Sequence, residues 1–210
     1  WVAERTESFL SDCHGRDHIT HAELAVSNDG TFLGFKNETI ANLGAYASVF
    51  GTVTPTYLFG PCATGVYKIP AAYTNVKAVF TNTAPVDAYR GAGRPEATYT
   101  IERLVEKAAV ELGMDKTEIR MKNFPTEFPF QQTLVHSVDS GDYAAGMNKA
   151  KQMADYEGFE KRREESEAKG KLRGIGVTTY FEACGIAPSA VVMSLGCGIG
   201  LWESAEVRFN

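Results

Sequence analysis

The sequence has few cysteines, and none of them lies close to another. They are Cys13, Cys62, Cys184 and Cys197, so the chain contains no CxxC pair. Iron–sulfur clusters and zinc sites built from clustered thiolates need several cysteines held together, which excludes both kinds of site from this chain. Scattered cysteines are typical of reduced cytoplasmic thiols rather than of a disulfide framework. We therefore expect a cytoplasmic protein.

The chain also lacks an excess of positive charge. It has 21 Lys and Arg against 26 Asp and Glu, which gives a formal net charge of −5 at pH 7. Proteins that bind nucleic acids or anionic membranes usually carry a basic surface. Neither partner is therefore expected.

Long hydrophobic runs are missing too, and no segment has the features of a secretory signal. The most apolar stretch, residues 186–202, contains Pro188 and three glycines. It is shorter than the roughly 20 residues that a membrane span needs. We expect a buried loop and strand there, and a membrane association that is peripheral at most.

What remains is the composition of an ordinary globular protein of 210 residues, 44% of them hydrophobic and 22% charged. Pro125 and Pro129 interrupt the residue pattern and give the predicted domain boundary, with one domain over 1–124 and the start of a second over 125–210. The chain opens on Trp1 and stops inside an alternating pattern typical of a strand. We interpret it as an internal fragment of a longer polypeptide.

Both strands and helices are predicted in the first domain. Residues 17–40 alternate between apolar and polar side chains around Asp29-Gly30, which is typical of a hairpin. Residues 76–81 form another strand. The clearest helix begins at Pro95 and ends at Gly113. Its apolar positions share one face: Ile101, Leu104, Val105, Ala108, Ala109 and Leu112.

Further elements are predicted after this helix. Asp115 and Glu118 have the spacing of a capping box at the start of a short helix. A Lys- and Glu-rich helix follows residue 142 and ends near Gly170, and strands are expected at 173–182 and 201–209. Strands and helices mix without a strict alternation, which favours an α+β fold over a doubly wound sheet.

The segment AYRGAGRPE, residues 88–96, is the most informative motif. Gly91 and Gly93 allow a tight turn, and Pro95 fits the first helical turn, whose N–H groups attract anions. The alternative is a turn that serves only to cap the helix. A dinucleotide-binding loop is disfavoured, because Pro85 separates the motif from the preceding strand and Glu96 replaces the third glycine.

Two other groups of side chains are weaker candidates. One is a possible zinc site formed by Cys13, His14, His18 and His21. In a strand, His21 would point away from His14 and His18. We therefore prefer to interpret these residues as polar side chains on a half-exposed hairpin. The other is a set of carboxylates beside apolar strands, which are usually surface residues: Glu182, Glu203 and Glu206.

Residues 79–124, which include AYRGAGR, closely resemble the molybdenum-binding large subunits of the xanthine oxidase family, in particular large subunits of the aerobic carbon monoxide dehydrogenase type. The resemblance continues through YKIP, FPFQQT, DSGDY and GLWESAEVR and so covers essentially the whole chain. It implies partial molybdopterin-binding domains of the aldehyde oxidase/xanthine dehydrogenase large-subunit fold. Residues 1–124 would be the C-terminal part of the first such domain and residues 125–210 the truncated start of the second.

The resemblance also implies a cofactor. A molybdenum-bearing molybdopterin, in its cytosine dinucleotide form, would contact the loop formed by Tyr89, Arg90, Gly91, Ala92 and Gly93. The complete enzyme would hydroxylate a small substrate with oxygen from water and pass electrons to a small 2Fe-2S subunit and a medium FAD subunit, as a dimer of heterotrimers. The base glutamate is expected downstream, so the fragment alone would hold no catalytic residue and would be inactive.

Three positions depart from the patterns of known relatives. Gly91 stands where carbon monoxide dehydrogenases carry the cysteine that binds copper, so copper and a metal ligand in this chain are not expected. Ala92 replaces a phenylalanine, and Leu58 stands where purine-oxidising relatives carry a substrate arginine. An aldehyde or an N-heterocycle is the favoured substrate. The alternatives are a genuine carbon monoxide dehydrogenase with a variant centre and a non-catalytic scaffold homologue.

Overall fold

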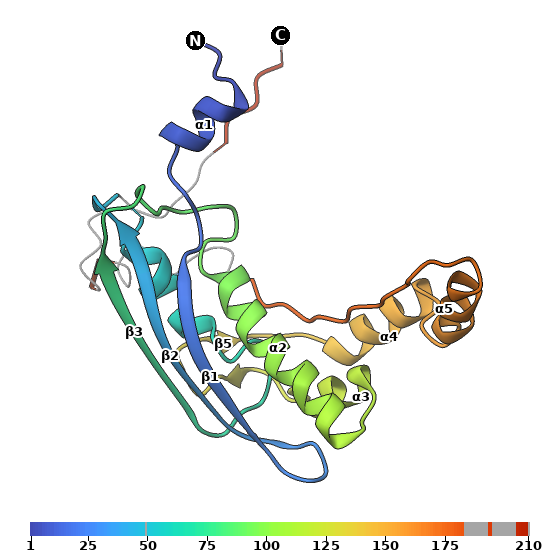
Figure 1. The fold of residues 1–210 in the computed structure, drawn as a ribbon. Helices are drawn as coiled ribbons and strands as arrows, with labels where there is room; N and C mark the ends of the chain where they lie inside the picture. The colour runs from blue at the N-terminus through green and yellow to red at the C-terminus, as the bar shows by residue number, and fades with distance from the viewer. Residues whose placement is uncertain (49, 183–192, 195–204, 210) are drawn as a thin grey trace.

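A three-stranded sheet forms the centre of the molecule in the computed structural model, which describes residues 1–48, 50–182, 193–194 and 205–209. The strand order is β1-β2-β3 (Figure 1). The central strand pairs antiparallel with β1 and parallel with β3. The strands are β1 (His18–Val26), β2 (Phe32–Gly44) and β3 (Ala72–Phe80).

The predicted hairpin is confirmed as β1 and β2. Its turn is closed by the N–H of Ser27, which donates to the carbonyl of Thr31 at 2.9 Å. Gly30 has a φ of 85°, a conformation that L-residues with side chains rarely adopt. The predicted strand at 76–81 is also confirmed, although β3 begins earlier, at Ala72.

The connection between β2 and β3, residues 45–71, contains two short helical turns that the sequence pattern did not indicate. They are the π-helix η1 (Thr54–Leu58) and the 3₁₀-helix η2 (Gly60–Cys62). Phe59, which lies between them, is fully buried. A crossover connection of this kind is required because β2 and β3 run parallel.

The predicted long helix is confirmed as α2 (Arg94–Leu112), which packs against the sheet beside β1 (Figure 1). Gly113 ends it in the left-handed conformation, with a φ of 64°. Asp115 caps α3 (Lys116–Lys122) as predicted, since its Oδ1 accepts hydrogen bonds from the N–H groups of Thr117 and Glu118 at 2.8 and 3.1 Å.

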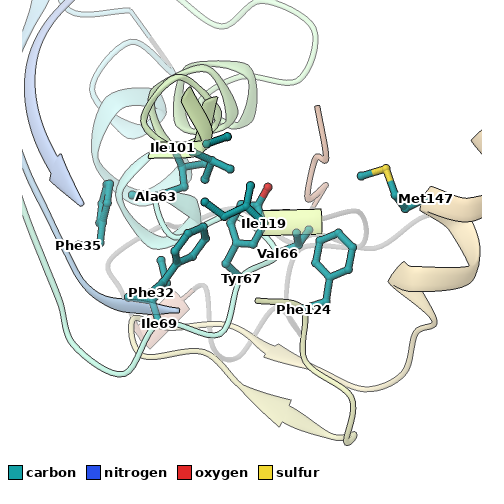
Figure 2. Close-up of a cluster of buried hydrophobic side chains, with 12 residues drawn as sticks. Phe32, Phe35, Ala63, Val66, Tyr67, Ile69, Ile101, Ile119, Phe124 and Met147 are labelled. Atoms are coloured by element: carbon teal, nitrogen blue, oxygen red, sulfur yellow. The ribbon is translucent and has the colours of Figure 1, made fainter. Parts of the chain in front are cut away.

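One hydrophobic cluster joins the sheet, the crossover connection and the helices (Figure 2). Each fully buried aliphatic or aromatic side chain contributes about 1.5–3 kcal/mol to folding. The buried face of α2 belongs to this cluster, as its apolar spacing predicted. The cluster consists of Phe32, Phe35, Ala63, Val66, Tyr67, Ile69, Ile101, Val105, Ala109, Ile119, Phe124 and Met147.

The Lys- and Glu-rich segment forms two helices rather than the one predicted. The chain turns at Asp155, whose φ is 45°, and the Arg162 guanidinium donates to the carbonyl oxygens of Ala154 and Asp155 at 3.0 and 2.7 Å. These bonds stabilise the turn that separates the helices. The remaining elements are α1 (Arg5–Ser11), β4 (Phe130–Gln131), β5 (Ser137–Val138), α4 (Tyr143–Met153) and α5 (Phe159–Glu167).

The prediction of two strands near the C-terminus is wrong for the residues that the structure describes. Residues 173–182 and 205–209 are irregular. The first segment contacts the core through Val177 and Phe181 and has no paired strand among the described residues. Side-chain contacts hold it in place of a hydrogen-bonded ladder. Residues 201–204 and most of the apolar stretch 186–202 lie outside the described residues.

None of the helices in the described ranges is both long enough and apolar enough to cross a membrane.

Candidate functional site

The AYRGAGR segment forms a tight loop that leads directly into α2, as the sequence predicted. The N–H of Ala92 donates to the carbonyl of Tyr89 at 2.7 Å, and the N–H of Arg94 donates to the carbonyl of Gly91 at 3.1 Å. Gly91 and Gly93 have φ values of 87° and 86°. Both glycines therefore occupy a region of backbone space that side chains rarely allow.

Both glycines are also required by the packing of the loop itself. A Cβ atom at Gly93 would lie 2.6 Å from the carbonyl carbon of Leu58 and from the nitrogen of Phe59. A Cβ atom at Gly91 would lie 2.9 Å from Cγ of Pro95. The backbone at Gly93 thus packs closely against the end of η1. Gly93 is also the N-cap residue of α2.

The two arginines of the motif have different environments. Arg90 is exposed, as is the neighbouring Tyr89. The side chain of Arg94 is 8% exposed; its Nη1 donates to the carbonyl of Ala92 at 2.9 Å, and its Nε lies 3.6 Å from Oε1 of Glu182. Arg90 can therefore reach a ligand, whereas Arg94 supports the loop from within.

Arg16, which lies on the segment between α1 and β1, also contacts the loop, although no pattern in the sequence indicated it. Its Nη2 donates to the carbonyl of Arg90 at 2.5 Å, and its guanidinium carbon lies 4.8 Å from the centre of the Tyr89 ring. Its Nε is 3.5 Å from Oε2 of Glu96. These contacts span more than 70 residues of sequence, so local spacing gave no signal for them.

A buried thiol and a partly buried imidazole lie close to Arg94. The Sγ of Cys62 is 3.4 Å from Nε2 of His136. Burial raises the pKa of Cys62 to about 11, which the charge of Arg94 only partly offsets. Burial also lowers the pKa of His136. Both groups are neutral near pH 7, so this thiol has little of the thiolate character that a nucleophile or metal ligand needs.

The structure does not bring the predicted cysteine and histidine group together as metal ligands. His14 precedes β1 rather than lying in it; its N–H donates to the carbonyl of Pro85 at 2.9 Å. His18 packs edge-on against Phe59 with ring centres 5.0 Å apart, and burial lowers its pKa. His21 is exposed beside Glu23, and Cys13 is exposed. Among the described residues, no group of three or more His, Cys, Asp or Glu side chains could hold a metal ion.

The three candidate carboxylates are also separate. Glu182 pairs with Arg94, and Glu206 forms an exposed ion pair with Arg208 at 2.9 Å. Glu203 lies outside the described residues. The usual interpretation of Glu206 as a surface carboxylate is therefore confirmed by its 75% exposed side chain.

Comparison with known proteins identifies the family of the chain. The family model described as molybdopterin cofactor-binding domain matches residues 1–124. The carbon monoxide dehydrogenase large chain of Hydrogenophaga pseudoflava is 38% identical over 218 residues, which cover 100% of this chain and 27% of that relative. The gamma subunit of the 6-hydroxypseudooxynicotine dehydrogenase complex of Paenarthrobacter nicotinovorans is 34% identical and covers 89% of this chain and 24% of its own length.

Among solved structures, quinoline 2-oxidoreductase from Pseudomonas putida 86 superposes with a TM-score of 0.85 and 32% identity, over 95% of this chain and 26% of that chain. The chain thus spans about a quarter of the length of the relatives it matches. The predicted fold, an α+β arrangement of the molybdopterin-binding large-subunit type, is confirmed by this likeness. The chain therefore belongs to the molybdopterin cofactor-binding domain family, as part of a large subunit of the carbon monoxide dehydrogenase and xanthine dehydrogenase type.

Proposed function

We propose that the intact protein is the molybdenum-cofactor-binding catalytic subunit of a molybdenum hydroxylase. The observation that carries the proposal is the 89–93 loop, which offers hydrogen-bond donors and has no side chain at Gly91 or Gly93. Arg90 is exposed there, and the N–H of Gly91 has no acceptor among the described residues. Such donors suit an electron-rich ligand that bears oxygen and sulfur atoms.

The residues of the loop fit a molybdopterin cofactor by their chemistry. Tyr89, Arg90 and Gly91 would contact it, with Ala92 and Gly93 completing the turn. When bound, the cofactor supplies the redox centre at which an electron-poor carbon gains oxygen derived from water. The Arg90 guanidinium would stabilise negative charge at that centre. The base glutamate of the reaction is expected outside this chain.

The substrate we favour is an N-heterocycle or an aldehyde. The N-heterocycle is supported by the names of two relatives, the quinoline oxidoreductase and the 6-hydroxypseudooxynicotine dehydrogenase subunit. Leu58 contacts the loop at Gly93 and is apolar where a purine-oxidising enzyme would need an arginine. With Ala92 in place of an aromatic side chain, the loop leaves room for a ring.

Carbon monoxide oxidation by a variant centre is the second candidate, because a carbon monoxide dehydrogenase large chain is 38% identical. The backbone at Gly91 argues against the copper that such an enzyme uses. At a φ of 87°, a Cβ atom there would lie 2.9 Å from the Pro95 ring. A cysteine would fit this loop only after the backbone moved.

The proposal includes partners and organisation that follow from the family resemblance. The cofactor would be the cytosine dinucleotide form, and electrons would leave through a small 2Fe-2S subunit and a medium FAD subunit in a cytoplasmic dimer of heterotrimers. Residues 125–210 would begin the second molybdopterin-binding domain. The match of the family model to residues 1–124 supports a boundary at that point.

Metal and pterin analysis of the intact protein, followed by a substrate screen, tests the proposal. We expect stoichiometric molybdenum and pterin, no stoichiometric copper, and dye reduction with quinoline-like heterocycles or aldehydes. Stoichiometric copper together with CO oxidation would favour the second candidate. Protein isolated intact without molybdenum or pterin would favour the non-catalytic scaffold instead.

A further inference from the structure

Arg16 is held against the cofactor loop by its own segment of main chain. The N–H of His14 donates to the carbonyl of Pro85 at 2.9 Å, and the N–H of Asp87 donates back to the carbonyl of His14 at 2.8 Å. Gly15 lies so close to Tyr89 that a Cβ atom there would be 2.9 Å from the Tyr89 Cβ. The residues before β1 and those before the 89–93 loop thus form one unit.

The backbone of Arg16 has a conformation that is uncommon for its residue type. Its φ is 62°, which few residues other than glycine adopt. Outliers of this kind persist only where surrounding contacts hold them, and they cluster at functional sites. Here the conformation directs a long, charged side chain towards the loop.

The inner end of the Arg16 side chain is fixed by a buried carboxylate. The Glu96 side chain is only 8% exposed, and neither of its oxygens accepts a hydrogen bond among the described residues. The Arg16 guanidinium forms an ion pair with this carboxylate, with Arg16 Nε 3.5 Å from Glu96 Oε2. An unpaired charge at such a site is strongly unfavourable, so Glu96 holds the Arg16 guanidinium in place.

The outer end of the same guanidinium fixes one peptide unit of the loop. Its Nη2 binds the carbonyl of Arg90 at 2.5 Å. In a trans peptide the carbonyl and the following N–H point in opposite directions. A hydrogen bond that holds the Arg90 carbonyl towards Arg16 therefore holds the Gly91 N–H away from Arg16. Because glycine permits many backbone conformations, this peptide would rotate more freely without that contact.

We propose that Arg16 is a positioning residue of the cofactor loop. It fixes the orientation of the peptide between Arg90 and Gly91, so that the Gly91 N–H and the Arg90 side chain are ready to meet the cofactor before it binds. The inference rests on the proposed function, and it adds a residue from a distant part of the chain to the site. Arg16 acts through the loop and does not touch the reacting atoms.

The test compares the intact protein with Arg16→Gln and Arg16→Lys variants. Lysine keeps the charge near Glu96 but not the planar fork that reaches Arg90 at the same time. Arg103→Gln, on the exposed side of α2, is the matched control. We expect Arg16→Gln to speed amide hydrogen exchange several-fold in peptides spanning residues 87–93, in protein with or without cofactor. Arg16→Lys should restore only part of the protection, and Arg103→Gln should change nothing.

In the loaded enzyme, the molybdenum electron paramagnetic resonance spectrum of Arg16→Gln should also change. Its kcat should fall by about 10- to 100-fold, as for other residues that orient the groups around a metal. Molybdenum content should stay near that of the parent protein. Either unchanged exchange or an unchanged spectrum in Arg16→Gln would overturn the inference.

The two proposals fail in different ways. If the parent protein contains molybdenum and Arg16→Gln exchanges like the parent, the inference about Arg16 is wrong and the proposed function stands. If the parent contains no molybdenum, the proposed function is wrong, and there is no cofactor for which Arg16 could position the loop. Should Arg16→Gln fail to fold, the same exchange measurement on Arg16→Lys decides, because lysine retains the positive charge near Glu96.

Discussion

Arg120 and Glu102 form a buried ion pair that joins α3 to α2. The Arg120 side chain is fully buried, and its Nε and Nη2 lie 2.9 and 2.8 Å from Oε2 of Glu102. The other carboxylate oxygen of Glu102 accepts hydrogen bonds from the hydroxyl groups of Tyr67 and Thr179. This network ties the crossover connection and the irregular segment 173–182 to the two helices.

Arg120→Met should therefore destabilise the protein strongly, because it leaves the Glu102 carboxylate buried without its cation. We expect a loss of about 3–5 kcal/mol in the free energy of unfolding, measured by urea denaturation. The control is Lys107→Met, which removes an exposed pair with Glu111 at 2.7 Å. It should change stability by no more than about 0.5 kcal/mol. Equal effects from the two variants would contradict this interpretation of the network.

Stability should fall as the pH is lowered from 7 to 5. Burial lowers the pKa of both His18 and His136 below the ordinary value of 6.5. The unfolded chain then binds more protons than the folded one, so acid favours unfolding. The free energy of unfolding begins to fall as the pH drops through 6.5, by at most about 1.4 kcal/mol per pH unit for each histidine. Urea denaturation across this range measures it, and His136→Gln should reduce the slope. A slope of the opposite sign would count against neutral, partly buried histidines at these two positions.

Two glycine-to-alanine substitutions should have opposite effects. Gly146 lies inside α4, is exposed, and has open space where a Cβ would be placed, so Gly146→Ala should stabilise the protein by about 0.5–1 kcal/mol. Gly93→Ala should destabilise it by at least about 2 kcal/mol, because the new methyl group meets the backbone of η1 at a positive φ. Thermal denaturation of both variants provides the comparison. Stabilisation by Gly93→Ala would refute the packing of the loop described here.

Cys62 should be unreactive in the folded protein. Its thiol is buried and has a pKa of about 11, whereas Cys13 is exposed. Since the thiolate is the reactive form, iodoacetamide at pH 8 should modify Cys13 well before Cys62. Mass spectrometry of the digested protein follows both residues, and unfolding in urea should remove the difference. Rapid modification of Cys62 in the native state would contradict its burial.

Gly91→Cys should not create a copper site. The substituted residue would have to adopt a φ near 87° and place its Cβ 2.9 Å from the Pro95 ring. The loop must therefore move before a thiolate can point outwards, and a displaced loop is unsuited to hold a metal. Copper analysis of the intact variant, with the parent protein as the control, should give no stoichiometric metal. A variant that gained copper and oxidised CO would revive the second candidate function.

Signals that are local in the sequence predicted much of the fold. Asp29-Gly30 located the hairpin, the apolar spacing and Gly113 located α2, and Asp115 located the start of α3. Each of these features depends on a few neighbouring residues, whose preferences act before any long-range contact forms.

Features set by distant contacts were not predictable in this way. The turn at Asp155 depends on a side chain seven residues further on, and residues 173–182 are irregular although their composition suits a strand. Within the candidate site, the glycine loop was visible from spacing, but Arg16 was not. Its contacts with the loop depend on how the chain folds across more than 70 residues.

The parallel pairing of β2 with β3 has a consequence for the order of folding. The hairpin of β1 and β2 needs only a short turn, but β3 cannot align until residues 45–71 have closed a long loop. The 89–93 loop packs at Gly93 against Leu58 and Phe59 of this connection, so it can take its native packing only once the connection is in place. We expect the 89–93 loop to be among the last parts of the protein to become native during refolding, and any cofactor that it binds to be captured late.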